Sequence, residues 1–149
     1  MKKIKIAAVS YLNTKPLLHG LFLNDVDKVA DIQTFIPSEC ARKLKDGEVD
    51  LALIPVAAIP EIANAEIVSD YCIGAEGYVH TVKIYGDCPI EEMEYIYLDF
   101  HSRTSVVLAQ ILLKEYWNLH PKLIPAPSNY LTKISGRVGA VIILSLIHI

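Results

Sequence analysis

Cysteine is scarce in this sequence, and the cysteines that occur are not paired. Three are present among 149 residues, Cys40, Cys72 and Cys88, and no C-x-x-C pair occurs. An odd number at wide spacing argues against a disulfide framework and against a zinc cage. Because reduced thiols are typical of the cytosol, we expect a cytoplasmic protein with no metal site.

Long basic runs and long apolar runs are also lacking. Lys and Arg number 14 against 17 Asp and Glu, and no basic cluster could follow a phosphate backbone, so nucleic acid is not an expected partner. The most apolar stretch, residues 138–149, is shorter than the roughly 20 residues of a membrane span. Lys5 interrupts the apolar run that an export signal needs. We therefore expect no membrane partner and no export.

The composition is that of a protein with packed cores, since 52% of the residues are hydrophobic and 21% are charged. In the first third of the chain, β-branched runs alternate with helical spacing. We expect strands at residues 4–9, 31–36 and 49–54, a helix that begins at Pro16, and a helix from Ser38 to near Gly47. This order predicts an α/β fold with a parallel sheet covered on both faces.

The remainder of the chain continues the α/β pattern after a flexible joint at residues 74–77. One helix is expected, at residues 106–116, with an N-terminus rich in hydroxyl groups. Further strands are expected at residues 67–73, 79–85, 95–98, 122–124 and 138–143.

Unusual residues follow two of the expected strands. Ser10, Tyr11 and Asn13 come after the first strand, and Pro55 and Val56 come after the third. Ligands of α/β sheets gather at the carboxyl ends of the strands, so a shallow site is expected between these two loops. The Asn13 amide could donate to and accept from a substrate hydroxyl, although an Asx-turn is the ordinary alternative.

A second candidate site lies between residues 99 and 105. Ser102, Thr104 and Ser105 bring hydroxyl groups to a helix N-terminus, where free backbone N–H groups and the helix dipole favour a carboxylate. The alternative is an ordinary capped helix, with Arg103 as surface charge. Thr81 could present its hydroxyl to a cleft, although Thr is also a favoured strand residue. No Walker loop, dinucleotide fingerprint or Ser-His-Asp order is present.

Residues 9–17, VSYLNTKPL, strongly resemble the opening motif of the chorismate dehydratases, the first enzymes of the futalosine route to menaquinone. Three later segments are similar to that family in order and spacing: residues 50–57, residues 73–82, and residues 98–105. The related dihydroxynaphthoate synthase, which cleaves a cyclic futalosine derivative, carries a Ser-Pro-Cys-Pro-Asn-type first loop instead. The sequence of this loop therefore favours the dehydratase.

The resemblance implies a fold like that of type II periplasmic binding proteins, with two α/β lobes, mixed and mostly parallel sheets, and substrate between the lobes. Residues 1–78 would form most of the first lobe and residues 79–143 part of the second. Family members are nearly twice this long, so an incomplete second lobe and an inactive chain are expected. Residues 144–149 depart from the family pattern and resemble a translated sequencing adapter, which predicts a non-native tail.

The activity that the resemblance implies is that of a hydro-lyase, which converts chorismate into 3-[(1-carboxyvinyl)oxy]benzoate and water without metal or redox cofactor. Asn13 and Thr81 match the family's catalytic polar pair, with Thr81 where relatives often have Ser. The residues expected to bind substrate are Ser10, Tyr11, Pro55, Val56, Ser102, Arg103, Thr104 and Ser105. Alternatives are a non-catalytic solute-binding module for a small carboxylate and the related dihydroxynaphthoate synthase.

Overall fold

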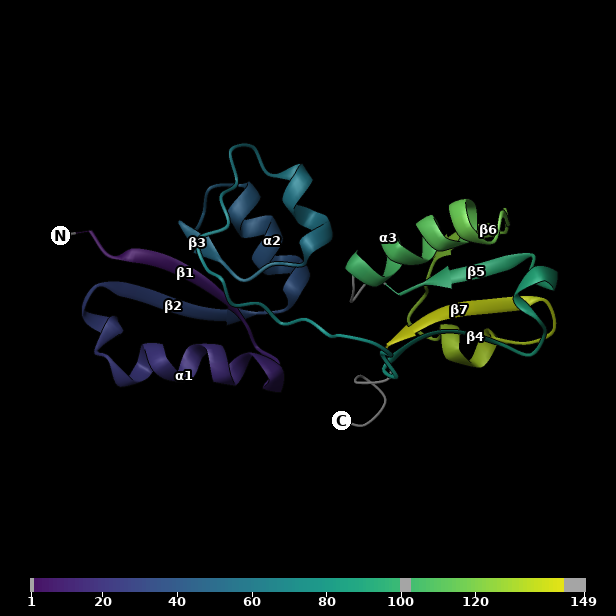
Figure 1. The fold of residues 1–149 in the computed structure, drawn as a ribbon, viewed down its shortest axis with the longest axis horizontal. Coiled ribbons are helices and arrows are strands. Elements are labelled where there is room, and N and C mark those ends of the chain that lie inside the picture. Colours follow the sequence, from purple (N-terminus) through teal and green to yellow (C-terminus); the bar gives the residue numbers. More distant parts are fainter. Residues whose placement is uncertain (1, 100–102, 144–149) are drawn as a thin grey trace. The chain divides into compact units, whose positions relative to one another are not determined.

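The N-terminal apolar run forms the central strand of a parallel sheet. The computed structural model describes residues 2–99 and 103–143, and the chain divides into two compact units, the first ending at Glu76 and the second beginning at Gly77 (Figure 1). In the first unit, β1 (Ile4–Val9) pairs in parallel with β2 (Ala30–Phe35) on one side and with β3 (Leu51–Ala52) on the other. The predicted parallel sheet is therefore confirmed.

Two helices flank the sheet of the first unit. Figure 1 shows α1 (Lys15–Leu23) on one side of the sheet and α2 (Pro37–Lys45) on the other. α2 has buried residues, Cys40 and Ala41, whereas α1 has none. Short 3-10 helices complete this unit at Leu12–Thr14, Val26–Lys28 and Val56–Glu61. Each of α1 and α2 has a proline in its first turn, where a missing N–H costs no hydrogen bond.

Small side chains let α2 pack closely on β1. Ala7 and Cys40 are both fully buried, and the Cys40 thiol donates to the Ala8 carbonyl with the sulfur 3.4 Å from the oxygen. Burial raises the pKa of the Cys40 thiol, so this side chain stays protonated and serves packing.

The second unit has a mixed sheet of strand order β4-β7-β5-β6. The strands are β4 (Val82–Gly86), β5 (Tyr95–Leu98), β6 (Lys122–Pro125) and β7 (Val138–Ile143). β5 runs parallel to both neighbours, whereas β4 runs antiparallel to β7. The helix α3 (Arg103–Ile111) continues into one π-helical stretch (Leu112–Tyr116), and 3-10 helices span Ile90–Glu92 and Tyr130–Lys133.

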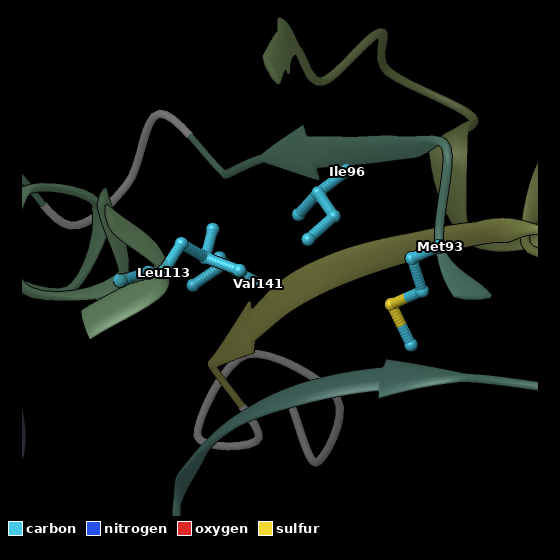
Figure 2. Close-up of a cluster of buried hydrophobic side chains, with 5 residues drawn as sticks. Met93, Ile96, Leu113 and Val141 are labelled. Carbon is cyan, nitrogen blue, oxygen red and sulfur yellow. The ribbon is translucent and has the colours of Figure 1, made fainter. Parts of the chain in front are cut away.

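The core of the second unit forms where α3 and its π-helical continuation pack on the sheet. Figure 2 shows Met93, Ile96, Leu113 and Val141, which cluster with the buried Ala109. A second cluster contains Tyr130, Ala140 and Ile142. Ala140 and Val141 are adjacent in β7 and belong to different clusters, as expected for a strand buried on both faces.

Most predicted strands are confirmed, but two predictions were wrong. The third strand, expected over residues 49–54, is limited to Leu51–Ala52. Residues 67–73 form no strand, and Ile67 and Tyr71 are about four-fifths exposed, at 79% and 80%. β-branched and aromatic residues favour a strand only where a neighbouring strand offers hydrogen bonds and a face to pack on.

Element starts also differ from the predictions. β4 begins at Val82, so residues 79–81 lie outside the strand, and α3 already includes Arg103 to Ser105. α2 begins after Ile36, with Pro37 rather than Ser38 in its first position.

None of the helices within the described residues has the length and apolar character needed to cross a bilayer. The α/β class is confirmed, the two-lobe binding-protein architecture stays a prediction, and the expected tail at residues 144–149 lies outside the described residues.

Candidate functional site

The candidate residues of the first unit lie at one edge of its sheet. Ile6 pairs with Leu51 and Ala7 with Ala52, and the Leu53 N–H donates to the Ala7 carbonyl at 3.0 Å. The parallel register therefore brings the chain after β1, beginning at Ser10, to the same edge as the chain after β3, beginning near Pro55.

The loop after β1 is held by its backbone. The Ser10 N–H donates to the Phe35 carbonyl at 2.9 Å, and the Thr14 N–H donates to the Tyr11 carbonyl at 3.1 Å. The Tyr11 ring packs on the core beside α2. Asn13 is exposed, and among the described residues its amide makes no hydrogen bond, so no Asx-turn holds it. Its amide is thus available to a ligand.

Thr14 is a residue that the sequence analysis missed. Its side chain is fully buried, and its hydroxyl has no hydrogen-bond partner among the described residues. Thr14 also precedes α1 without capping that helix through its side chain. Buried hydroxyls are normally paired, which marks this turn as unusual. No sequence signal distinguishes Thr14 from an ordinary N-cap threonine.

Pro55 and Val56 begin the 3-10 helix that follows β3. Pro55 is half-buried and its carbonyl accepts from the Ala58 N–H at 2.9 Å, whereas the Val56 side chain is 65% exposed. Val56 therefore offers an apolar surface at the edge where the loop after β1 also emerges.

The candidate residues of the second unit also gather at one sheet edge. β5, β6 and β7 are parallel, so their carboxyl ends share an edge, and the amino end of the antiparallel β4 lies there too. Figure 1 shows the arrowheads of β5 and β7 at this edge, where α3 begins. Thr81, exposed in the turn before β4, and Asp99, directly after β5, both lie at this edge.

The first turn of α3 carries Arg103, Thr104 and Ser105, all of them half-buried. The first N–H groups of a helix have no partner within the helix, and the dipole gives them a partial positive charge. Two hydroxyls beside such N–H groups can bind a carboxylate. Ser102, expected to act with them, lies outside the described residues.

A buried pair beside this turn escaped the sequence analysis. The Tyr130 hydroxyl donates to Oδ2 of Asp99 at 3.0 Å, and the two residues are only 9% and 3% exposed. Burial, with the charge of Asp99, raises the pKa of Tyr130 to about 12, so the phenol stays protonated and remains a donor. The two residues are 31 positions apart, and no local pattern relates them.

Two surface hollows, of about 480 Å³ and 300 Å³, are lined by other residues than these. One of about 480 Å³ is lined by residues that precede β5 and β6, among them Glu94 and His120, at the opposite edge of the second sheet. Within residues 2–99 and 103–143, no group of three or more His, Cys, Asp or Glu side chains could hold a metal ion. The two sets of candidate residues belong to different units, and their union in one site stays a prediction.

Parallel strands joined by helices, with the candidate residues at the strand ends and at a helix N-terminus, define an α/β protein. A family model described as menaquinone biosynthesis matches residues 4–144, and the chain belongs to that family. The match confirms the family resemblance of the sequence and assigns the chain a role in menaquinone biosynthesis.

Proposed function

We propose that the protein is a chorismate dehydratase, an enzyme that converts chorismate into 3-[(1-carboxyvinyl)oxy]benzoate and water. The observation that carries this proposal is the loop after β1. Its YLNTKP sequence resembles the dehydratase form of the motif, and it follows the central strand of a sheet in a chain of the menaquinone biosynthesis family. The exposed, unengaged amide of Asn13 in that loop supports a role in contact with substrate.

The first turn of α3 is proposed to bind the ring carboxylate of chorismate. The proton at ring carbon 3 is conjugated with this carboxylate through a ring double bond. Loss of the proton therefore places negative charge on the carboxylate oxygens. Donors that face these oxygens, here the Thr104 and Ser105 hydroxyls and the backbone N–H groups beside them, stabilise the dienolate more than the ground state. Ser102 and Arg103 are proposed to assist them.

Asn13 and Thr81 are proposed to orient the hydroxyl at ring carbon 4. The enolpyruvyl carboxylate of the substrate takes the carbon 3 proton, and the C–H electron pair becomes part of the aromatic ring. The carbon 4 hydroxyl then leaves with that same proton as water, which returns the enolpyruvyl group to its carboxylate form. Aromatisation drives the reaction, and positioning supplies most of the catalysis. Ser10, Tyr11, Pro55 and Val56 are proposed to line the substrate at the edge of the first sheet.

The test is to incubate the protein, expressed from the complete reading frame of its gene, with chorismate and to follow the aromatic product by ultraviolet absorbance and mass spectrometry. We expect 3-[(1-carboxyvinyl)oxy]benzoate and one equivalent of water. Chorismate that binds and is recovered unchanged would instead indicate a solute-binding module. Turnover of a cyclic futalosine derivative, with none of chorismate, would indicate dihydroxynaphthoate synthase.

A further inference from the structure

The buried pair Tyr130–Asp99 joins two loops that leave the same sheet edge. Asp99 directly follows β5, and Tyr130 begins the 3-10 helix after β6. The strands that precede them are hydrogen-bonded neighbours, and the Ala126 N–H extends this pairing to the Leu98 carbonyl at 3.0 Å. The side-chain hydrogen bond of 3.0 Å therefore joins the two loops just beyond the point where the backbone pairing of β5 and β6 ends.

Packing fixes the position of the Tyr130 ring. The ring lies 6.3 Å from that of Tyr97 between centroids, at an interplanar angle of 58°, and is buried in a cluster with Ala140 and Ile142. Tilted ring pairs of this kind are favourable. The packing of the ring against the sheet therefore holds the Tyr130 hydroxyl in a fixed position.

The carboxylate that accepts this hydrogen bond belongs to Asp99, which precedes α3 in the chain. Asp99 is four positions before Arg103, the first described residue of the helix, and is 3% exposed. A buried carboxylate needs donors to compensate for lost water, and a donor held by packing also fixes where the carboxylate lies. Asp99 is thereby held directly after β5, four positions before the first described residue of α3.

We propose that Tyr130 is a positioning residue: its hydrogen bond to Asp99 holds the first turn of α3 in the geometry that binds a substrate carboxylate. This inference rests on the proposed function for the identity of the carboxylate. The ordering of the turn can be measured without any substrate. Tyr130 itself touches neither substrate nor reacting atoms and acts through Asp99.

The test is Tyr130→Phe, which removes the hydroxyl and keeps the packed ring. By ¹⁵N relaxation we expect the order parameters of the Arg103, Thr104 and Ser105 amides to fall from about 0.85 towards 0.6, while those of β5 stay high. By calorimetry we expect chorismate to bind about tenfold more weakly, because binding must then order a turn that is already ordered in the unaltered protein. A merely structural role would lower the unfolding temperature and leave both readouts in place.

Tyr97→Phe is the matched control, because it removes a hydroxyl from the other ring of the pair. Among the described residues the Tyr97 hydroxyl makes no hydrogen bond. We expect both readouts to match those of the unaltered protein. If Tyr130→Phe does not fold, Asp99→Asn decides, since its amide oxygen still accepts from Tyr130 and should keep the turn ordered.

Unchanged order parameters in Tyr130→Phe, or a disordered turn in Asp99→Asn, would overturn the inference. So would equal chorismate affinity of Tyr130→Phe and the unaltered protein. An unaltered protein that binds no chorismate contradicts the proposed function alone, and the order parameters then still decide whether Tyr130 positions the turn.

Discussion

Asn13 is held in place by its neighbours and not by its own side chain. The turn around it closes through the Thr14 N–H and the Tyr11 carbonyl, and Thr14 is buried directly after it. A side chain that supports no local structure can be changed at little cost to the fold, so its contribution to chemistry can be measured in isolation.

We expect Asn13→Ala to lower turnover of chorismate about a hundredfold, the usual cost of losing one polar group that acts in the transition state. Chorismate affinity should change much less, because the carboxylate donors belong to α3. Steady-state kinetics with calorimetric titration measure both quantities. Gln110→Ala, which removes an exposed amide on α3, is the control. Unchanged turnover in Asn13→Ala would remove Asn13 from the mechanism.

At the scale of single elements, a network of ion pairs secures the end of α2. Arg42 contacts Glu39, Asp46 and Glu48 at 2.7 Å each, and Lys43 contacts Glu48 at 2.7 Å. Hydrogen bonds from Arg42 and Lys43 lower the pKa of Glu48 to about 2. The folded state therefore favours the ionised carboxylate.

The lowered pKa of Glu48 predicts that the stability of the folded state depends on pH in the acid range. Its stabilising effect is complete above the ordinary value of 4.5 and is lost as the pH falls through about 2. We expect Arg42→Ala to move the pKa of Glu48 upwards towards 4.5, as followed by the ¹³C shift of its carboxyl carbon. High salt should shrink the difference, because the pairs are exposed. A pKa of Glu48 that stays near 2 in Arg42→Ala would contradict the role of the network.

A close approach of β4 and β7 depends on two glycines. Gly86 pairs with Gly139, and a Cβ built on Gly139 would lie 2.4 Å from the sulfur of Met93 and 3.2 Å from the Tyr85 carbonyl oxygen. The first contact would force the Met93 side chain to move, and the second would require the Tyr85 backbone to give by a few tenths of an ångström. The side chain of Met93 fills the space that the missing methyl groups leave.

We expect Gly139→Ala to destabilise the protein by about 1–3 kcal/mol, the usual cost of overpacking. Gly20→Ala is the control, since a Cβ there meets nothing within 4 Å and the residue lies inside α1. That change should stabilise by up to about 1 kcal/mol. Urea unfolding measures both. Equal stability of the Gly139 variant and the unaltered protein would show that the strands can separate at no cost.

Some elements could be predicted from sequence because their local pattern and their tertiary setting agree. The runs at residues 4–9, 95–98 and 138–143 are strands in the structure, as expected of short apolar segments bounded by turns. Residues 67–73 are also rich in β-branched and aromatic side chains and form no strand, because strand formation needs a pairing partner that sequence does not reveal.

The same limit applies to the candidate site. The loop after β1 and the first turn of α3 could be found from residue types, whereas the Tyr130–Asp99 bond depends on the pairing of β5 with β6. The unpartnered hydroxyl of Thr14 is likewise a property of packing. Local sequence therefore predicts which residues are candidates for the site, whereas the contacts that position them follow only from the topology.

At the scale of the whole molecule, each unit has a core of its own. Ala7, Val9 and Cys40 cluster in the first, and the cluster around Ile96 and Val141 lies in the second. We expect Ile96→Ala to cost about 2–5 kcal/mol, as truncations in a packed core do. Hydrogen exchange should show lost protection in β5 and β7 and unchanged protection in β1 and β2.

Val9→Ala is the reciprocal variant and should lower protection in β1 and β2 alone. Equal loss of protection in both units, for either variant, would mean that the two cores unfold together as one cooperative body. The comparison uses one measurement on the intact chain.

Every residue from 63 to 81 is exposed, and no helix or strand occurs between the end of the 3-10 helix after β3 and the start of β4. Such a stretch is the preferred substrate of proteases. Chymotrypsin should cleave first after Tyr71 or Tyr78, which are 80% and 92% exposed. The same stretch is the natural place to divide the gene, so that each half can be expressed, purified and studied as a separate polypeptide.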